Sequence, residues 1–234
     1  MAIDGMLKEK VVLVTGATGG LGRHVTRAFL DAGATVVGTS PKIQQSDFDH
    51  RNFTAMAAQI SGLADAKQLV NQVLSRFQKI DVLAHTVGGF AGGQTIADTD
   101  DATFQGMFKI NLNSTFHALR AVIPPMRHRK YGRIIAIGSR AALEPGANVG
   151  AYSASKAAMV SLIRTAAEEN KDAGITANVI LPGTMDTPAN RQAMPNADFS
   201  TWVRPASVAS LMTLLAGDAG KGINGAVIPV YGAS

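Results

Sequence analysis

Apolar runs of two kinds alternate along this chain. Short runs rich in β-branched residues are typical of strands that are buried on both faces, whereas longer segments with apolar residues every three or four positions are typical of amphipathic helices. The expected strands are residues 10–15, 35–39, 52–56, 80–87, 132–139, 175–183 and 225–230. The expected helices are residues 21–33, 63–77, 101–130, 150–174 and 205–217.

This regular strand and helix order predicts the fold class. Each strand, helix, strand unit needs a right-handed crossover, which makes the sheet parallel. We therefore expect an α/β fold, a doubly wound Rossmann-type sheet of seven strands with helices on both faces, in a single domain over residues 1–234. Residues 184–204 form a polar, proline-marked loop, and a loop of that length is expected to serve the substrate.

Composition narrows the functional classes. With 46% hydrophobic and 17% charged residues, the 234-residue chain can bury a large core. It has no cysteine, so disulfides and thiolate zinc sites are excluded, and no metal is expected. We expect His24, His85 and His117 to be structural or surface residues, and scattered carboxylates do not favour a hydrolase. No signal peptide or membrane-length apolar run is visible, which favours a cytoplasmic protein without membrane contact.

The net charge of +5 raises the question of nucleic-acid binding. The basic residues are scattered except in residues 127–133, where a helix is expected to end and cations complement its dipole. We therefore expect no nucleic-acid partner, and the basic excess also suits an anionic phosphate ligand.

A glycine-rich turn lies between the first strand and the first helix. In "VTGATGGLG", Gly16, Gly20 and Gly22 let the backbone approach a pyrophosphate, which the amide groups at the helix N-terminus then bind. We expect Thr18 and Leu21 of the same turn to contribute to this dinucleotide site.

Tyr152 and Lys156 lie four positions apart in "AYSASKAAMV", a spacing that by itself only puts them on one face of a helix. Together, "TGATGGLG" and "YSASK" resemble the short-chain dehydrogenase/reductase family, and the resemblance covers nearly the whole chain. It implies that Tyr152 and Lys156 are catalytic. It also implies catalytic roles for Ser139, thirteen residues before the tyrosine, and for Asn111 on the long helix over residues 101–130.

The same resemblance implies further cofactor contacts. "LPGTMDT" is similar to the segment that lies beside the nicotinamide in this family, with Pro182, Gly183 and Thr187. Gly88 ends "HTVG", where the family commonly has Asn-Asn-Ala-Gly. Gln59 stands where an aspartate near the adenine is often found.

Carbonyl reduction needs a hydride from the nicotinamide and a proton from the protein. Tyrosine has an ordinary pKa of about 10, and we expect the Lys156 ammonium to lower it and also to bind the ribose hydroxyls. Ser139 would hydrogen-bond the substrate oxygen as negative charge develops there. By resemblance, Asn111 would hold a water molecule that links Lys156 to solvent.

The end of the second expected strand bears on the choice of cofactor. NAD-dependent enzymes usually place an acid there for the ribose 2′-hydroxyl, but this chain has Ser40, followed by Lys42. Absence of a carboxylate removes a repulsion against a 2′-phosphate, and Lys42 would attract it, so NADP(H) is favoured over NAD(H). Gly19 opposes this, since NADP-preferring relatives often have arginine in its place.

Two segments, residues 87–93 and 181–202, resemble the dihydropteridine reductases. In the second, apolar side chains are placed to form a lid over a planar ring; they are Met185, Met194, Phe199 and Trp202. Dihydropteridine reductases, however, tend to use NADH and to lack the serine. Three functions stay open: hydride transfer to a quinonoid pterin or another carbonyl substrate, a 3-oxoacyl reductase or general carbonyl reductase, and a non-catalytic NAD(P)-sensing protein. The family resemblance implies a homodimer or homotetramer built on the two long helices and the last strand.

Overall fold

The computed structural model describes residues 5–233 and contains one seven-stranded parallel sheet with strand order β3-β2-β1-β4-β5-β6-β7. The order reverses between β1 and β4, as a doubly wound sheet requires, so the predicted fold class is confirmed. The strands are β1 (Val11–Thr15), β2 (Thr35–Thr39), β3 (Phe53–Ala55), β4 (Val82–His85), β5 (Gly132–Ile137), β6 (Ile175–Pro182) and β7 (Val227–Val230).

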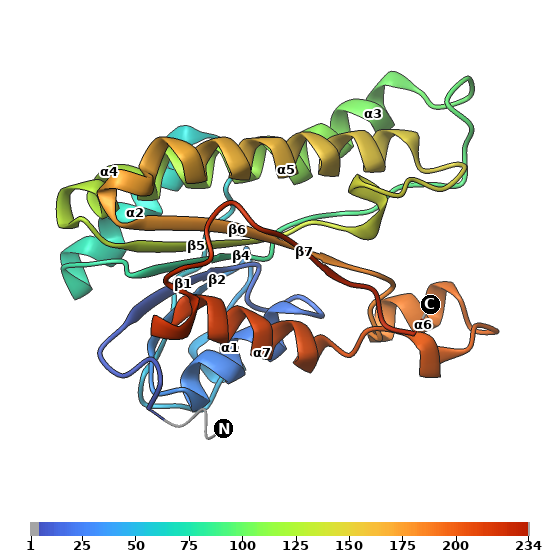
Figure 1. Cartoon of the computed structure of the whole chain (residues 1–234). Helices are drawn as coiled ribbons and strands as arrows, with labels where there is room; N and C mark the ends of the chain where they lie inside the picture. Colours follow the sequence, from blue (N-terminus) through green and yellow to red (C-terminus); the bar gives the residue numbers. More distant parts are fainter. Residues whose placement is uncertain (1–4, 234) are drawn as a thin grey trace.

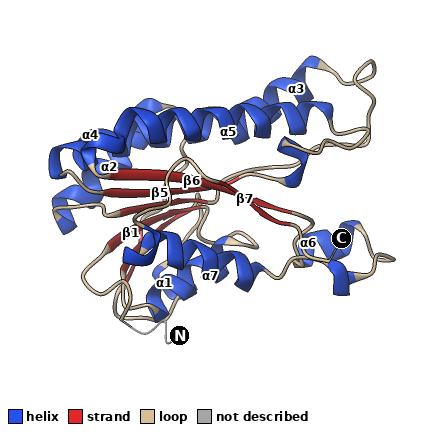
Figure 2. Ribbon diagram, viewed as in Figure 1, coloured by secondary structure: helices blue, strands red, loops and turns tan. Residues whose placement is uncertain are grey.

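Helices cover both faces of the sheet (Figures 1 and 2). On one face lie α1 (Gly22–Asp31) and α7 (Pro205–Ala216), and on the other lie α2 (Leu63–Phe77), α4 (Ser114–Arg129) and α5 (Gly150–Asn170). Two shorter helices, α3 (Asp101–Met107) and α6 (Pro188–Ala193), lie at the end of the molecule where the strands terminate.

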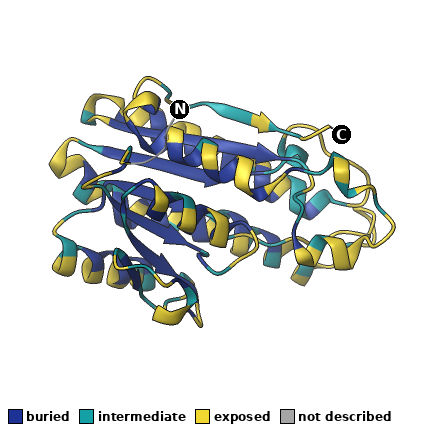
Figure 3. Ribbon diagram, turned by 90° about the horizontal axis from the view of Figure 1, so that it is seen from below, coloured by how far each residue is buried: buried dark blue, intermediate teal, exposed yellow. Residues whose placement is uncertain are grey.

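The strands separate two hydrophobic cores. Along β1, Val12 and Val14 pack in the cluster on the α1 and α7 side, whereas Val11 and Leu13 pack in the cluster on the α2, α4 and α5 side. Figure 3 shows the strands as the most buried layer, except for the edge strand β7. Burial on both faces explains why the strands read as continuous apolar runs.

The helix expected over residues 101–130 is present over residues 101–129, but it is not α-helical throughout. Between α3 and α4 the chain makes a π-helical turn over residues 108–113, which contains Asn111. The expected loop over residues 184–204 also has structure of its own, because Thr187 caps α6 by accepting a hydrogen bond from the Asn190 amide. π-helical turns are common at functional sites.

The basic cluster expected at a helix end does lie in the last turn of α4 and just beyond it. Arg129 pairs with Asp81 at 2.9 Å, and the Arg127 Nε donates to the Asn170 side-chain oxygen at 2.5 Å. These two arginines therefore tie α4 to β4 and α5 at the amino-terminal edge of the sheet.

Within residues 5–233, no helix is long and apolar enough to cross a membrane. The same part of the chain brings together no group of three or more His, Asp or Glu side chains that would hold a metal ion.

Candidate active site

The predicted site residues gather at the carboxyl ends of the strands, on the side of the molecule where Figure 1 shows α3 and α6. They come from the turn after β1, the segments after β2, β4, β5 and β6, the turn between α3 and α4, and the start of α5. This edge, beside the reversal in strand order, is where open α/β sheets bind ligands.

The glycine turn has the close contacts expected of a pyrophosphate site. Gly16 has a φ of +75°, and a Cβ there would lie 2.9 Å from the Thr86 hydroxyl oxygen. A Cβ at Gly22 would lie only 2.0 Å from the Gly16 carbonyl oxygen. Leu21 is buried just before α1, and Gly20 approaches the Thr187 side chain. The turn is therefore packed against the segment that follows β6.

A cavity of about 520 Å³ opens beside this turn and is lined by Gly16, Thr18, Ser40 and Gly88 among others. The Ser40 hydroxyl accepts from the Thr18 amide at 3.2 Å and donates to the Thr39 carbonyl at 2.8 Å. The lining is made of backbone, hydroxyl and apolar groups; among the described residues Lys109 is its only charged member and no carboxylate lines it. These groups fit a dinucleotide.

Two cations flank the cavity without lining it. Lys42 is exposed just beyond Ser40. Arg23, which the sequence did not single out, donates from Nε to the Thr18 carbonyl at 3.1 Å and pairs with Asp47 at 3.2 Å. Arg23 lies in the first turn of α1. Only the fold shows that its side chain points back to the glycine turn.

Lys156 is 4% exposed on α5 and donates from Nζ to the Ile137 carbonyl at 2.8 Å. Burial lowers the pKa of its ammonium to about 8. The carbonyl is the last of β5, so the lysine is held at the carboxyl end of that strand.

Tyr152 lies one turn before Lys156 and is half-buried. Burial raises the pKa of its phenol, and a hydrogen bond with the Ser139 hydroxyl acts in the opposite direction with less effect. The net lowering of this pKa that was expected from Lys156 is therefore not found in this structure, because burial of the phenol has the largest effect. Ser139 also accepts from the Ala141 amide at 3.2 Å, so it caps a turn as well as contacting Tyr152.

Asn111 is fully buried in the π-helical turn, and its amide group connects three segments. Its side-chain oxygen accepts from the Gly89 amide at 2.9 Å, and its nitrogen donates to the Gly89 carbonyl at 3.1 Å and to the Ser155 hydroxyl at 3.0 Å. Ser155 in turn donates to the Tyr152 carbonyl at 2.7 Å. Asn111 thus positions both the loop after β4 and the turn of α5 that carries Tyr152.

Gly88 lies between these residues and the cavity. A Cβ there would lie 3.0 Å from the Asn111 side-chain oxygen and 3.1 Å from the Lys156 Nζ. The cavity and the predicted catalytic residues Asn111 and Lys156 therefore meet at Gly88.

His85 was expected to be structural or on the surface, and it lies fully buried at the centre of the site. Its Nδ1 is 2.8 Å from the Thr15 hydroxyl and its Nε2 is 3.4 Å from the Ser114 hydroxyl. Ser114 donates its proton to the Ile110 carbonyl at 2.5 Å, so its oxygen accepts from Nε2 and Nδ1 accepts from Thr15. Burial, with a smaller effect from the Lys156 charge, lowers the pKa of His85 to about 3, and the ring is neutral.

Pro182, Gly183 and Thr187 lie at the end of β6 and just after it. The Gly183 amide donates to the Val230 carbonyl at 2.9 Å, and Thr187 is buried against the glycine turn. The segment that by resemblance lies beside the nicotinamide is thus held between β7 and the pyrophosphate turn.

The aromatic residues expected to form a lid pack against one another. The rings of Phe199 and Trp202 are 4.7 Å apart, and the Arg191 guanidinium lies 4.5 Å from the Phe199 ring. Arg191 also binds Asp186 at 2.5 and 2.9 Å. In the same loop Met185 packs on the core and Met194 is exposed.

Phe90 also lies beside Tyr152. The sequence indicated it only as a member of residues 87–93, the first of the two segments that resemble the dihydropteridine reductases. Its ring lies 5.0 Å from the Tyr152 ring in an edge-to-face arrangement, yet 68% of the residue is exposed.

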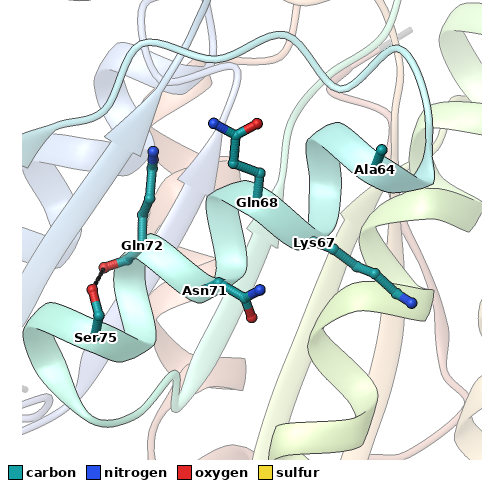
Figure 4. Close-up of a pocket in the computed structure, with 6 residues that line it drawn as sticks. All are labelled: Ala64, Lys67, Gln68, Asn71, Gln72 and Ser75. Atoms are coloured by element: carbon teal, nitrogen blue, oxygen red, sulfur yellow. Dashed lines mark hydrogen bonds between the residues drawn. The ribbon is translucent and has the colours of Figure 1, made fainter.

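A second hollow, on the outer face of α2, is shown in Figure 4. It is lined by polar side chains of one helix, including Lys67, Gln68 and Asn71, and is wide open to solvent. It contains none of the predicted site residues.

Comparisons with known proteins agree with this geometry. The family model described as short chain dehydrogenase matches residues 10–198. The uncharacterized oxidoreductase YvrD of Bacillus subtilis is 30% identical over 98% of this chain and 98% of its own. The 3-oxoacyl acyl-carrier-protein reductase FabG of Salmonella typhimurium is 28% identical over 95% of this chain and 96% of its own. The crystal structure of gox2181 covers 99% of this chain and 98% of its own with a TM-score of 0.91 and 26% identity.

Fold and site together define an oxidoreductase of the Rossmann class. The chain belongs to the short-chain dehydrogenase/reductase family, as its sequence motifs predicted. Membership implies use of a nicotinamide dinucleotide, NAD or NADP.

Proposed function

We propose that this protein is an NAD(P)H-dependent reductase that transfers hydride to a carbonyl or quinonoid ring substrate. The observation that carries the proposal is the convergence of Ser139, Tyr152 and Lys156 beside a carboxylate-free cavity that meets them at Gly88. A non-catalytic sensor of NAD(P) would not need this set. The presence of all three residues therefore argues against a non-catalytic sensor, although "HTVG" stands where the family commonly has Asn-Asn-Ala-Gly.

The residues have distinct roles in the proposed reaction. The nicotinamide, when bound, supplies the hydride. Tyr152 donates the proton to the substrate oxygen, since its raised pKa keeps the phenol protonated at neutral pH. Ser139 hydrogen-bonds the same oxygen, and the Lys156 ammonium stabilises the phenolate left behind. Asn111 holds the turn of α5 that carries Tyr152 through Ser155.

NADP(H) is the proposed cofactor in preference to NAD(H). Ser40 replaces the acid that would bind a ribose 2′-hydroxyl, and no carboxylate of the described residues lines the cavity. Lys42 and Arg23 both flank this end of the cavity and would attract a 2′-phosphate. The ion pair with Asp47 partly neutralises the charge of Arg23.

We propose two alternative classes of substrate. The resemblance of residues 87–93 and 181–202 to dihydropteridine reductases supports a quinonoid pterin, whereas the serine, and the likeness to a 3-oxoacyl reductase, support a carbonyl substrate. A homodimer or homotetramer belongs to the same proposal, supported by the exposed Phe116 on α4 and the half-exposed edge strand β7. A solution molar mass of one 24.4 kDa chain would exclude it.

The test measures oxidation of NADPH and NADH in parallel, with quinonoid dihydropterin, a 3-oxoacyl thioester and small dicarbonyl compounds as acceptors. We expect turnover with at least one acceptor and a lower KM for NADPH. Tyr152→Phe should lower kcat at least about 100-fold, the usual size of a lost proton donor, with an unchanged dissociation constant for NADPH. Wild-type turnover by this variant would exclude the mechanism, and a lower KM for NADH would reverse the cofactor assignment.

A further inference from the structure

The Phe90 ring lies directly beside the proton donor of the proposed reaction. One edge-to-face contact, at 5.0 Å between ring centroids, joins it to Tyr152. The tip of the side chain lies close to Gly92, where a Cβ would lie 2.9 Å from the Phe90 Cζ. With 68% of the residue exposed, most of the ring faces open space at the site. A large aromatic surface left open beside a reacting group is typical of a ligand contact.

Other exposed apolar side chains lie in the segments that follow the strands at the same edge of the sheet. Ile96 is 84% exposed and lies against the start of α5, where a Cβ at Gly150 would lie 2.9 Å from its Cγ1. Leu143, 55% exposed, follows Ser139 in the segment after β5, and Met194, 42% exposed, follows α6. Phe90, Ile96, Leu143 and Met194 thus come from the segments that follow β4, β5 and β6. We refer to these four residues as the apolar rim.

Two arginines near the apolar rim are paired with carboxylates. Arg140, next to Ser139, binds Glu144 at 2.8 Å, and Arg191 binds Asp186 through two nitrogens. Each arginine also lies over an aromatic ring, that of Tyr231 or of Phe199. An anionic carrier group, such as the phosphate of a thioester carrier, would have to compete with these carboxylates.

We propose that the substrate is a neutral, flat, apolar carbonyl compound, and that Phe90 determines specificity by packing against its ring. This inference rests on the proposed reductase function. In the proposed reaction, bound NADPH would supply a hydride to the carbonyl carbon and Tyr152 a proton to the carbonyl oxygen, so that the π bond is replaced by one C–H and one O–H bond while the C–O single bond remains. Solvent then returns a proton to Tyr152, and NADP⁺ leaves.

The test compares two uncharged dicarbonyl compounds with similarly activated carbonyl groups. Isatin is a planar bicyclic ring, whereas 2,3-butanedione is small and acyclic. Phe90→Ala should lower kcat/KM for isatin about ten-fold, mainly through KM, because a lost aromatic contact has this size. The value for 2,3-butanedione should change less than about three-fold, since this compound has no ring to pack.

Two further variants separate specificity from support of Tyr152. Phe90→Leu keeps an apolar side chain beside Tyr152 without the ring and should show an intermediate loss for isatin alone. Phe104 lies on α3, is 40% exposed and pairs with Phe108. Phe104→Ala should leave kcat/KM unchanged for both compounds.

The contrary outcomes distinguish failure of the Phe90 inference from failure of the proposed reductase function. If Phe90→Ala lowers kcat/KM equally for both compounds, or for neither, Phe90 does not determine specificity and the inference is wrong. Preference of the wild type for an anionic thioester over isatin would also overturn it, while leaving the reductase function intact. Failure to reduce any carbonyl compound, with NADPH bound, would reject the proposed function itself.

Discussion

At the scale of single residues, burial favours the neutral forms of the two principal groups in the proposed mechanism, Tyr152 and Lys156. Burial raises the pKa of the Tyr152 phenol and lowers that of the Lys156 ammonium to about 8. Tyr152 is therefore a protonated acid throughout the physiological range. Lys156 is the group whose charge changes near neutral pH.

This difference predicts a pH dependence of the reduction. Lys156 is charged below about pH 8 and stabilises the phenolate that proton donation leaves, so kcat/KM should be constant between pH 6 and 7. Above pH 8 the rate should fall about ten-fold per pH unit as the ammonium loses its proton. Lys156→Arg keeps the charge, since a guanidinium stays protonated, and should remove this fall while lowering the maximal rate. The measurement is the pH profile of kcat/KM with a saturating cofactor.

Lys67→Arg is the matched control, because Lys67 is exposed on α2. It should reproduce the wild-type profile. A wild-type rate that stays constant to pH 9.5, or an unchanged fall in Lys156→Arg, would show that Lys156 does not control the reaction.

The candidate catalytic residues carry a pattern that the sequence shows, whereas their supporting contacts were not predictable from it. Ser139, Tyr152 and Lys156 lie within eighteen positions and carry a recognisable pattern. The partners of Asn111 lie 22 and 44 positions away, at Gly89 and Ser155, and only the fold brings them together. Local pattern contains no information about such contacts.

At the scale of elements, β1, β4 and the start of α4 are joined by one buried side chain. His85 ends β4, Thr15 ends β1, and Ser114 begins α4. The apolar periodicity runs through residues 101–130 and predicts one helix. The periodicity does not show whether an amide binds the carbonyl four residues earlier, as in an α-helix, or five residues earlier, as in a π-helix. The π-helical turn coincides with the side-chain contacts of Asn111 and Ser114, which sequence periodicity does not encode.

The His85 connection predicts a loss of stability that depends on pH. His85→Leu leaves the Thr15 hydroxyl without its partner and should lower the free energy of unfolding by about 1–2 kcal/mol at pH 7. In the folded wild type the pKa of His85 is about 3, below the unfolded value of about 6.5, so unfolding takes up a proton and stability falls as the pH decreases from 6.5 to 3. The variant should lack this part of the fall. Urea unfolding at pH 7 and pH 5 measures both effects.

His24→Leu, at an exposed position of α1, is the control and should leave stability nearly unchanged. If His85→Leu is as stable as the wild type at pH 7, the three elements do not depend on this ring.

At the scale of the whole molecule, the two edges of the sheet have different roles. The carboxyl edge holds the cavity and the proposed catalytic residues, whereas the amino edge holds an ion cluster centred on Asp81. This carboxylate is 2% exposed and binds Arg129 at 2.9 Å, Lys79 at 3.1 Å and the Val11 amide at 2.8 Å. β5 spans both edges, and its six residues separate them by about 20 Å.

This separation predicts a variant that loses stability and keeps activity. Burial raises the pKa of Asp81, but the Val11 amide, Arg129 and Lys79 together outweigh it and hold the pKa below its usual range. The carboxylate therefore stabilises the fold above about pH 4, and this contribution is lost as the pH falls through the lowered pKa. Asp81→Asn should lower the free energy of unfolding at pH 7 by about 2–3 kcal/mol, and the difference from the wild type should shrink as the pH falls below about 4. Its kcat at 25 °C should stay within about two-fold of the wild type, because the reacting groups lie at the other edge. Asp31→Asn, at the exposed end of α1, controls for the loss of one charge, and a kcat that falls in step with stability would show that the two edges are coupled.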